Sequence, residues 1–393
     1  MTSKFDEIRP YNNADLPLIL SSLVQQKEFI DTLVAHKFAK WPSVTKPVLA
    51  FFTKWFVVKE ASKIQNIKEF QALIEPYIKR MIKTSTTSLS VSGLDTLDLS
   101  KPCLFISNHR DIALDPAFVN WVLHINGKDT VRIAVGDNLL RRNWVADLFR
   151  LNKCFVVKRT VEGRREKLNA AKLLSEYINH SLKVDQQHLW IAQREGRAKD
   201  GIDTTNNAIL SMLSMHKPKD LDFGDYMSQL RIVPVSISYE FDPCDINKAK
   251  EMHRAEKTGA YDKQDNEDMQ SIVEGITGQK GRVHIHFGKL LGSAYTNTKE
   301  VAKYLDDEIL AAYNTFSTAH AAISLLKNYP NYEYLSQFSQ ENELDNQEQD
   351  NLSVAHQYLE TRLGQLNIDE QQKLLCMYAN PLLRKHASRI FIA

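Results

Sequence analysis

Short apolar runs alternate with helical patterns through the middle of this chain. Between residues 116–125 and again over 162–182, apolar side chains recur at helical spacing. The apolar or alternating pattern typical of β-strands appears in 87–95, 103–107, 131–135, 154–158, 188–192, 231–239 and 282–288. Strands that alternate with helices predict an α/β fold, with a mostly parallel central sheet flanked by helices.

Both ends of the chain have helical patterns only. Apolar positions recur at helical spacing over residues 14–84, and the strand patterns stop after about residue 295. A further helical pattern then opens at a plausible cap, Asn297 or Thr298. We therefore expect an N-terminal helical region over 1–87, a core over 88–295 and a C-terminal helical region over 296–393.

Residues 46–61 allow two interpretations. Val48, Phe51, Phe52 and Trp55 follow i, i+3, i+4, i+7 spacing, which predicts a helix. The first interpretation is a buried helix of an N-terminal bundle. The second is a helix in a membrane interface, with Trp41 and Trp55 at headgroup level. In that case anionic lipid would meet the lysines at positions 40, 46, 54 and 59.

The composition narrows the classes of partner and compartment. A net charge of +2 gives no general attraction to polyanions, so we expect no nucleic-acid partner. The four cysteines lack CxxC spacing, which argues against a zinc site and fits a reducing compartment. The first residues lack a secretory pattern, and no apolar window of about 18 residues predicts a membrane-spanning helix. We expect a cytoplasmic protein, attached peripherally to the cytoplasmic face of a membrane.

The segment FISNHRDIALDP, residues 105–116, holds the candidate chemistry. His109 follows a predicted strand, at the sheet edge where α/β proteins bind ligands. A carboxylate that accepts the Nδ1 proton of a histidine leaves Nε2 free to take a proton from an alcohol. No G-x-S-x-G segment is present, and no cysteine lies in a nucleophile motif, so a substrate hydroxyl would be the nucleophile.

Two aspartates compete to orient His109. Asp115 precedes Pro116, and proline favours the first position of a helix, so we expect Asp115 to be the N-cap of a helix that begins at Pro116. Capping a helix could be its whole role, or one carboxylate oxygen could cap while the other contacts His109. Asp111 is the competing orienter.

Several blocks of the sequence, in order, resemble the 1-acyl-glycerol-3-phosphate acyltransferase family, one of the glycerolipid acyltransferases with an NH-x4-D motif. The resemblance covers roughly residues 88–292. It rests on VSGLDTLDLSKPCLFISNH, NHRDIALDP, CFVVKR, IAQREGRAKDG, IVPVSI and VHIHFGKLL. Each block alone is weakly specific, whereas the ordered set is strongly so. The resemblance implies a glycerolipid-acyltransferase-like core in a divergent, bacterial-type member.

Two departures from the family pattern matter. Here the histidine and the aligned aspartate follow H-x5-D spacing, and E-G-R stands where the family has E-G-T-R. We align Asp115 with the family aspartate and place the extra residue in the turn, because within a helix it would rotate the carboxylate by about 100°. The shorter third block leaves open whether Arg194 or Arg197 takes the phosphate-contacting position.

The resemblance implies that the protein moves a fatty acyl group from acyl-CoA or an acyl carrier protein to the free hydroxyl of 1-acyl-glycerol-3-phosphate, giving phosphatidate. His109 would be the general base and Asp115 its orienter, with no metal and no cofactor beyond the thioester co-substrate. Pro234 would shape the acyl groove. Substrate-binding residues would be Asn108, Arg110, Lys158, Arg159, Glu195, Gly196 and Arg197.

Other interpretations stay open at this point. The acceptor could be glycerol-3-phosphate or a lyso-aminolipid instead. The two departures also allow a non-catalytic, membrane-associated homologue. His284 and His286 share one face of a predicted strand, but with no third ligand nearby we expect no metal site.

Overall fold

The computed structural model describes residues 4–38, 41–42, 45–259, 267–337 and 346–392. Within these ranges seven strands form a single sheet, in the order β1-β7-β6-β2-β5-β3-β4. Five of its six pairings are parallel, and only β6 and β7 run antiparallel. The strands are β1 (Thr86–Ser92), β2 (Leu104–Ser107), β3 (Arg132–Gly136), β4 (Cys154–Val157), β5 (Leu189–Ala192), β6 (Ile232–Tyr239) and β7 (Gly281–Phe287).

The prediction of an α/β fold with a mostly parallel sheet is confirmed, and each strand overlaps a predicted one. The central strands are apolar on both faces because helices cover both. In β2, Leu104 and Ile106 pack into one hydrophobic cluster, while Phe105 packs into the cluster on the opposite face. This alternation is the two-residue period of a strand.

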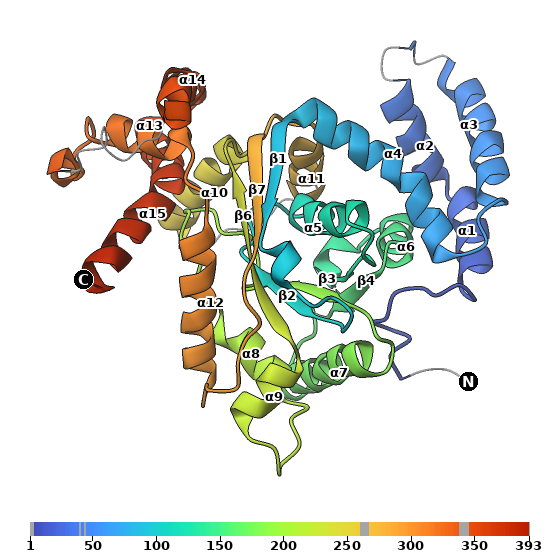
Figure 1. The fold of residues 1–393 in the computed structure, drawn as a ribbon. Helices are drawn as coiled ribbons and strands as arrows, with labels where there is room; N and C mark the ends of the chain where they lie inside the picture. Colours follow the sequence, from blue (N-terminus) through green and yellow to red (C-terminus); the bar gives the residue numbers. More distant parts are fainter. Residues whose placement is uncertain (1–3, 39–40, 43–44, 260–266, 338–345, 393) are drawn as a thin grey trace.

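Helices form a layer on each side of the sheet (Figure 1). Residues from α7 (Arg164–Lys183), α8 (Asn207–Ser214), α9 (Phe223–Gln229) and α12 (Thr298–Ala312) contribute to the first cluster. Residues from α4 (Ile67–Ser85) and α5 (Leu114–Ile125) contribute to the second. The short helix η2 (Leu94–Thr96) lies between β1 and β2, and η3 (Asp137–Leu139) directly follows β3.

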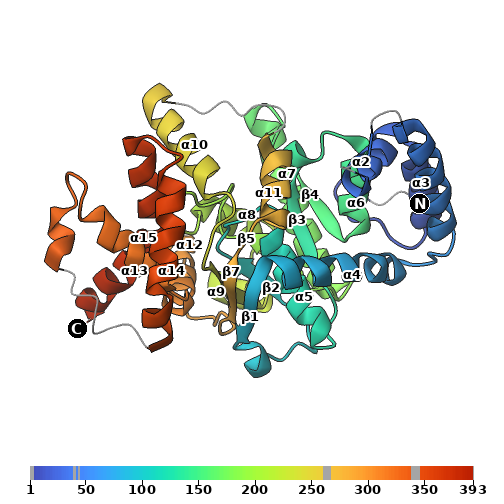
Figure 2. The same ribbon diagram turned by 90° about the horizontal axis from the view of Figure 1, so that it is seen from above.

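The helical additions lie at opposite ends of the molecule (Figures 1 and 2). At one end α1 (Leu16–Gln25), α2 (Lys27–Lys37) and α3 (Lys46–Ala61) meet α4 and α6 (Asn143–Leu151) around their own apolar cluster. The other end contains α10 (Asp245–Thr258), α13 (Ser317–Leu326), η4 (Glu333–Gln337), α14 (Asn346–Leu363) and α15 (Ile368–Ile392). Helix α11 (Glu267–Thr277) contacts α4. Domain boundaries at residues 87 and 295 stay a prediction.

None of the helices that the structure describes is both long enough and apolar enough to cross a bilayer.

Candidate active site

His109 and Asp115 lie together at the carboxyl end of β2. The imidazole Nδ1 is 2.8 Å from Asp115 Oδ2. The His109 side chain is 14% exposed and the Asp115 side chain is fully buried. Among the described residues Nε2 has no hydrogen-bond partner, and His109 lines a large cleft. The pair can therefore accept a proton from a group in the cleft.

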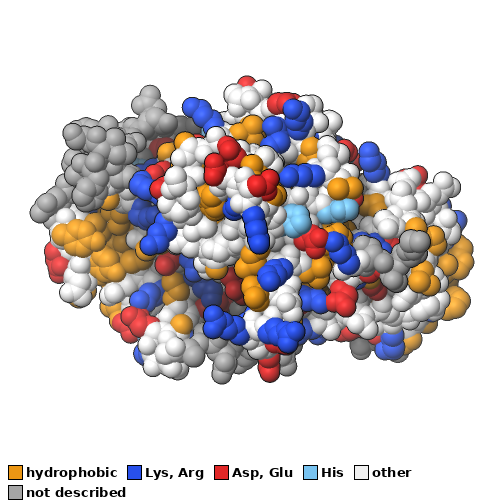
Figure 3. Space-filling model, turned by 90° about the horizontal axis from the view of Figure 1, so that it is seen from below, with side chains coloured by type: hydrophobic (Ala, Val, Ile, Leu, Met, Phe, Trp, Pro, Cys, Tyr) orange, Lys and Arg blue, Asp and Glu red, His pale blue; other side chains and the backbone are white. Residues whose placement is uncertain are grey.

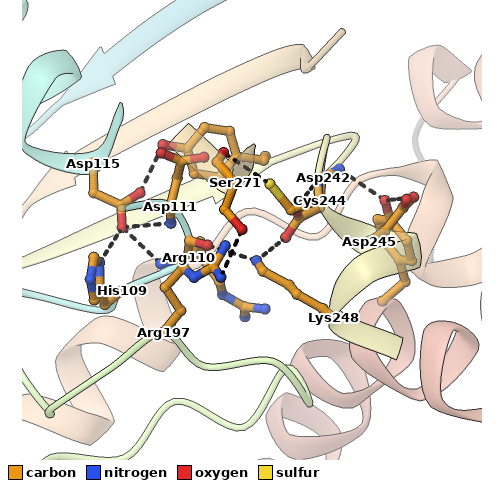
Figure 4. Close-up of polar contacts among 12 residues, drawn as sticks. His109, Arg110, Asp111, Asp115, Arg197, Asp242, Cys244, Asp245, Lys248 and Ser271 are labelled. Atoms are coloured by element: carbon orange, nitrogen blue, oxygen red, sulfur yellow. Dashed lines mark hydrogen bonds and ion pairs between the residues drawn. The ribbon is translucent and has the colours of Figure 1, made fainter. Parts of the chain in front are cut away.

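Four donors hold the Asp115 carboxylate in place. Besides His109, Oδ2 accepts the backbone N–H groups of Arg110 at 2.7 Å and Asp111 at 3.0 Å. The hydroxyl of Tyr239, at the end of β6, donates to Oδ1 at 2.8 Å. Burial, followed by the nearby Asp115 charge, raises the pKa of Tyr239 well above its usual range, so the hydroxyl stays a donor. Such a carboxylate fixes the orientation of the imidazole (Figure 4).

The helix after this turn begins earlier than predicted. Helix α5 starts at Leu114, so Asp115 lies in its first turn, and the prediction that it caps a helix starting at Pro116 is wrong. Asp111 supplies the capping contacts instead, because its Oδ1 accepts the N–H groups of Ala113 at 2.9 Å and Leu114 at 2.8 Å. The turn before α5 thus accommodates the extra residue of the H-x5-D spacing.

The competing aspartate, Asp111, faces away from the imidazole. It is buried against Gly275 of α11, where an added Cβ would come within 2.2 Å of Oδ2. Burial, and then the neighbouring Asp115 charge, raise the pKa of Asp111. No contact joins it to His109 among the described residues, so the geometry favours Asp115 as the orienter.

The cleft that His109 lines has a volume of about 1420 Å³. Its wall is mainly apolar and comes from both the core and the N-terminal helices. Helix α3 contributes Phe56 and Val57, α4 contributes Phe70 and Ile74, and β5 contributes Trp190. A large, mainly apolar cleft with a few polar side chains in its wall is typical of a site for an amphiphilic ligand.

Five of the predicted substrate-binding residues line this cleft with His109. They are Lys158, Arg159, Glu195, Gly196 and Arg197. Arg159 Nε is 3.6 Å from Glu195 Oε1, and Lys158 pairs with Glu7.

Arg159 lies close to a glycine that sequence reasoning missed. Its side chain passes over Gly136, where an added Cβ would come within 2.9 Å of Arg159 Nε. Asp137 Oδ1 also accepts the Arg159 N–H, at 3.1 Å. The glycine that ends β3 was the available signal, because it suggests close approach of another group.

Gly196 has a φ of +73°, and an added Cβ there would meet no atom within 4 Å. The strain of this φ favours glycine, and the open space leaves the backbone accessible from the cleft.

Two of the predicted substrate-binding residues and the acyl-groove candidate do not line the cleft. The amide of Asn108 is buried and exchanges two hydrogen bonds with the backbone of Ile237, at 2.8 and 2.9 Å. Arg110 is buried and donates to Asp203 Oδ2 at 2.6 Å. Pro234 lies within β6, which has strands on both sides. These positions suit residues that shape the site rather than contact a ligand.

The two arginines of the third block differ in environment. Arg197 is buried, and its Nη2 lies 3.3 Å from Ser271 Oγ and 3.8 Å from Glu251 Oε1. Arg194 is half-buried, lines the cleft and has no ion pair or hydrogen bond from its side chain within the described part of the chain. Arg194 is therefore the cation more available to a ligand.

No cluster of three or more metal-ligating side chains occurs among the residues that the structure describes. His284 and His286 lie along β7 and contact serines of β1. Ser90 Oγ is 2.8 Å from His284 Nδ1, and Ser92 Oγ is 2.8 Å from His286 Nδ1.

Residues 88–238 match a family model described as acyltransferase. No curated protein matches the chain. Among solved structures, the chain is similar to the crystal structure of the 1-acyl-sn-glycerophosphate (LPA) acyltransferase PlsC from Thermotoga maritima. The sequence identity is 13% and the TM-score is 0.35, over 76% of this chain and 92% of that chain.

Proposed function

We propose a specific reaction, starting from the match of residues 88–238 to a family model described as acyltransferase. The protein transfers a fatty acyl group from acyl-CoA or an acyl carrier protein to the free hydroxyl of 1-acyl-glycerol-3-phosphate, giving phosphatidate. The observation that carries the proposal is the 2.8 Å contact between His109 Nδ1 and the buried Asp115, in a histidine that lines a large, mainly apolar cleft.

The reaction needs one base and no enzyme nucleophile. His109 Nε2 takes the proton of the acceptor hydroxyl while the hydroxyl oxygen forms a bond to the thioester carbonyl carbon. Asp115 stabilises the imidazolium that results. When the tetrahedral intermediate collapses, the carbon–sulfur bond breaks and the imidazolium returns its proton to the departing thiolate.

The segment after β5 suits the charged parts of the reaction. The accessible backbone at Glu195 and Gly196 can supply N–H donors to the oxyanion. Arg159 and Arg194, with Lys158 nearby, are the cations we assign to the acceptor's phosphate. We assign Arg197 a supporting role instead of phosphate binding, because its buried guanidinium contacts Ser271.

Helix α3 supports a peripheral membrane location. Phe51, Phe52 and Trp55 are 70%, 61% and 59% exposed, and the helix buries none of its residues. Figure 3 shows hydrophobic side chains along the outer edge of the N-terminal helices, at the right of the view. An exposed aromatic face beside lysines is typical of a helix that lies in a bilayer interface.

The test is an acyl-transfer assay of wild type and His109→Ala. Oleoyl-CoA and acyl carrier protein thioesters are offered with a lysolipid panel, and products are identified by mass spectrometry. We expect phosphatidate from wild type and a loss of at least about 100-fold in turnover for the variant. His284→Ala, on β7 outside the cleft, is the matched control.

The possible outcomes separate the alternatives. Acylation of glycerol-3-phosphate or a lyso-aminolipid would keep the mechanism and change the acceptor. Retained turnover in folded His109→Ala would contradict the base assignment. No product from any pair would favour the non-catalytic homologue.

Arg159→Ala tests the phosphate assignment. Because the guanidinium would bind the acceptor in both ground state and transition state, the KM for the acceptor should rise about 10-fold, with kcat less affected. Steady-state kinetics with each substrate varied in turn measure this. A rise confined to the KM of the donor would contradict the assignment.

A further inference from the structure

Lys248 of α10 is a fully buried lysine behind the candidate site. Its ammonium donates to the carbonyl oxygen of Arg110 at 2.6 Å and pairs with Asp242. Burial of an ammonium group is costly unless it is paired and hydrogen-bonded, and these two contacts compensate for that cost.

The carbonyl that Lys248 contacts belongs to the peptide group between Arg110 and Asp111. The N–H of that same peptide group donates to Asp115 Oδ2 at 3.0 Å. Asp115 Oδ2 is the oxygen that contacts His109 Nδ1. One peptide plane therefore has the Lys248 cation on its oxygen side and the Asp115–His109 pair on its N–H side (Figure 4).

This series of contacts couples Lys248 to the Asp115–His109 pair both electrostatically and sterically. A cation on a carbonyl oxygen polarises the peptide and strengthens its N–H as a donor. We propose that Lys248 is a positioning residue, which holds the Asp115–His109 pair through the Arg110–Asp111 peptide. The reaction in which it acts rests on the proposed function.

The C-terminal helices contact Asp242, the carboxylate that pairs with Lys248. The backbone N–H of Asp242 donates to the Tyr378 hydroxyl of α15 at 2.8 Å, and Tyr378 donates to Asp245 at 3.0 Å. Tyr358 of α14 donates to the same Asp245 oxygen at 2.9 Å. The C-terminal helices thereby gain a function, which is to support the turn between His109 and α5 from behind.

The first measurement is the titration of the His109 ring, by NMR of histidine-labelled protein with the signal assigned by His109→Gln. We expect Lys248→Met to raise the titration midpoint by roughly half a pH unit. Losing the cation favours the imidazolium, and a weaker peptide donor makes Asp115 a stronger partner for it. The substitution leaves the charged cleft residues Arg159, Arg194, Glu195 and Arg197 in place, together with Asp115. Asp111 and Asp242 lose the nearby Lys248 charge.

The second measurement is steady-state kinetics. For Lys248→Met we expect kcat to fall about 10-fold while the KM values of both substrates stay within about twofold, because only the base is displaced. Lys250→Met removes a charge from the same helix, and no contact joins Lys250 to the turn among the described residues. Both the midpoint and kcat should be unchanged in this control.

A double variant keeps the test decisive if Lys248→Met folds poorly. Asp242→Asn combined with Lys248→Met removes both charges, so no unpaired carboxylate is left buried. We expect this protein to fold and to remain about 10-fold slower than wild type. A wild-type midpoint and wild-type kcat in a folded variant would overturn the proposal. If wild type transfers no acyl group, the proposed function fails by itself, and the midpoints still decide the role of Lys248.

Discussion

The two helical ends of the molecule use apolar residues in opposite ways. Helix α3 buries none of its sixteen residues, whereas α13 buries eight of its ten. The buried helix is built from small side chains such as Ala319, Ala321 and Ala322, and it packs between α14 and α15. The exposed helix carries bulky aromatics such as Phe51 and Phe52.

Side-chain size explains much of this difference. Alanines let helices approach closely, so most of α13 can be enclosed. The rings of α3 extend beyond what α1 and α2 can cover and leave a continuous apolar surface. An apolar helical pattern therefore predicts a helix, while residue size helps to indicate whether protein or another apolar phase covers it.

The largest expected effect is on the stability of the C-terminal end. Leu374 of α15 is fully buried, so Leu374→Ala should lower the free energy of unfolding by about 2–5 kcal/mol. Urea titration followed by circular dichroism measures this. Val354→Ala on α14, at a 52% exposed position, should change it by less than about 0.5 kcal/mol. Equal losses of unfolding free energy in the two variants would mean that buried packing does not stabilise the C-terminal end.

The next effect concerns the N-terminal end. Replacing Phe51, Phe52 and Trp55 together by glutamate should weaken liposome binding at least about 100-fold, because apolar area and charge both then oppose insertion. Cosedimentation measures the binding, and the free energy of unfolding should stay nearly constant. The matched control places three glutamates at exposed apolar positions of the other end: Tyr334, Val354 and Ile368. An equal loss of liposome binding in both variants would mean that the N-terminal end is not the specific membrane contact.

The smallest effect is a pH dependence confined to the C-terminal end. Burial raises the pKa of Asp245 to about 6, and the opposing charge of Arg362 only partly offsets this. Between pH 4 and 6 the folded protein therefore retains a proton that the unfolded chain has released, so this residue's contribution to stability is lost as pH rises.

Asp245→Asn removes that dependence. Its free energy of unfolding, relative to wild type, should rise by about 2 kcal/mol between pH 4 and pH 7. Urea titration at the two pH values measures this. Asp350→Asn, at an exposed position of α14, should show no such change. If the unfolding free energy of Asp245→Asn differs from that of wild type by the same amount at both pH values, the raised pKa of Asp245 is contradicted.

Much of the sheet could be predicted because its strands are short, buried and apolar, and the signal is local. The approach of a carboxylate to His109 could also be anticipated, since Asp115 is only six residues away. The residues alone left Asp111 and Asp115 open, and only the family resemblance favoured Asp115. The Tyr239 hydroxyl that donates to Asp115 lies 124 residues away in the sequence, so this contact could not be predicted.

Contacts between distant segments explain the other misses. Lys248 looks like any helical lysine, and its contact with Arg110 spans 138 residues. Asn108 and Arg110 flank the histidine and so seemed suited to bind substrate, yet both are turned into the protein. Which side of a turn faces solvent is decided by the helices that pack behind it, and a local pattern does not contain that information.

Helix α3 lines the cleft with Phe56 and Val57 while its other aromatics face outward. If that face lies on a bilayer, a lysolipid can move from the membrane into the cleft without passing through water. The encounter becomes two-dimensional, so the rate would follow the mole fraction of acceptor in the membrane rather than its amount per volume of solution. Diluting the acceptor with inert lipid at constant total acceptor should then slow the reaction.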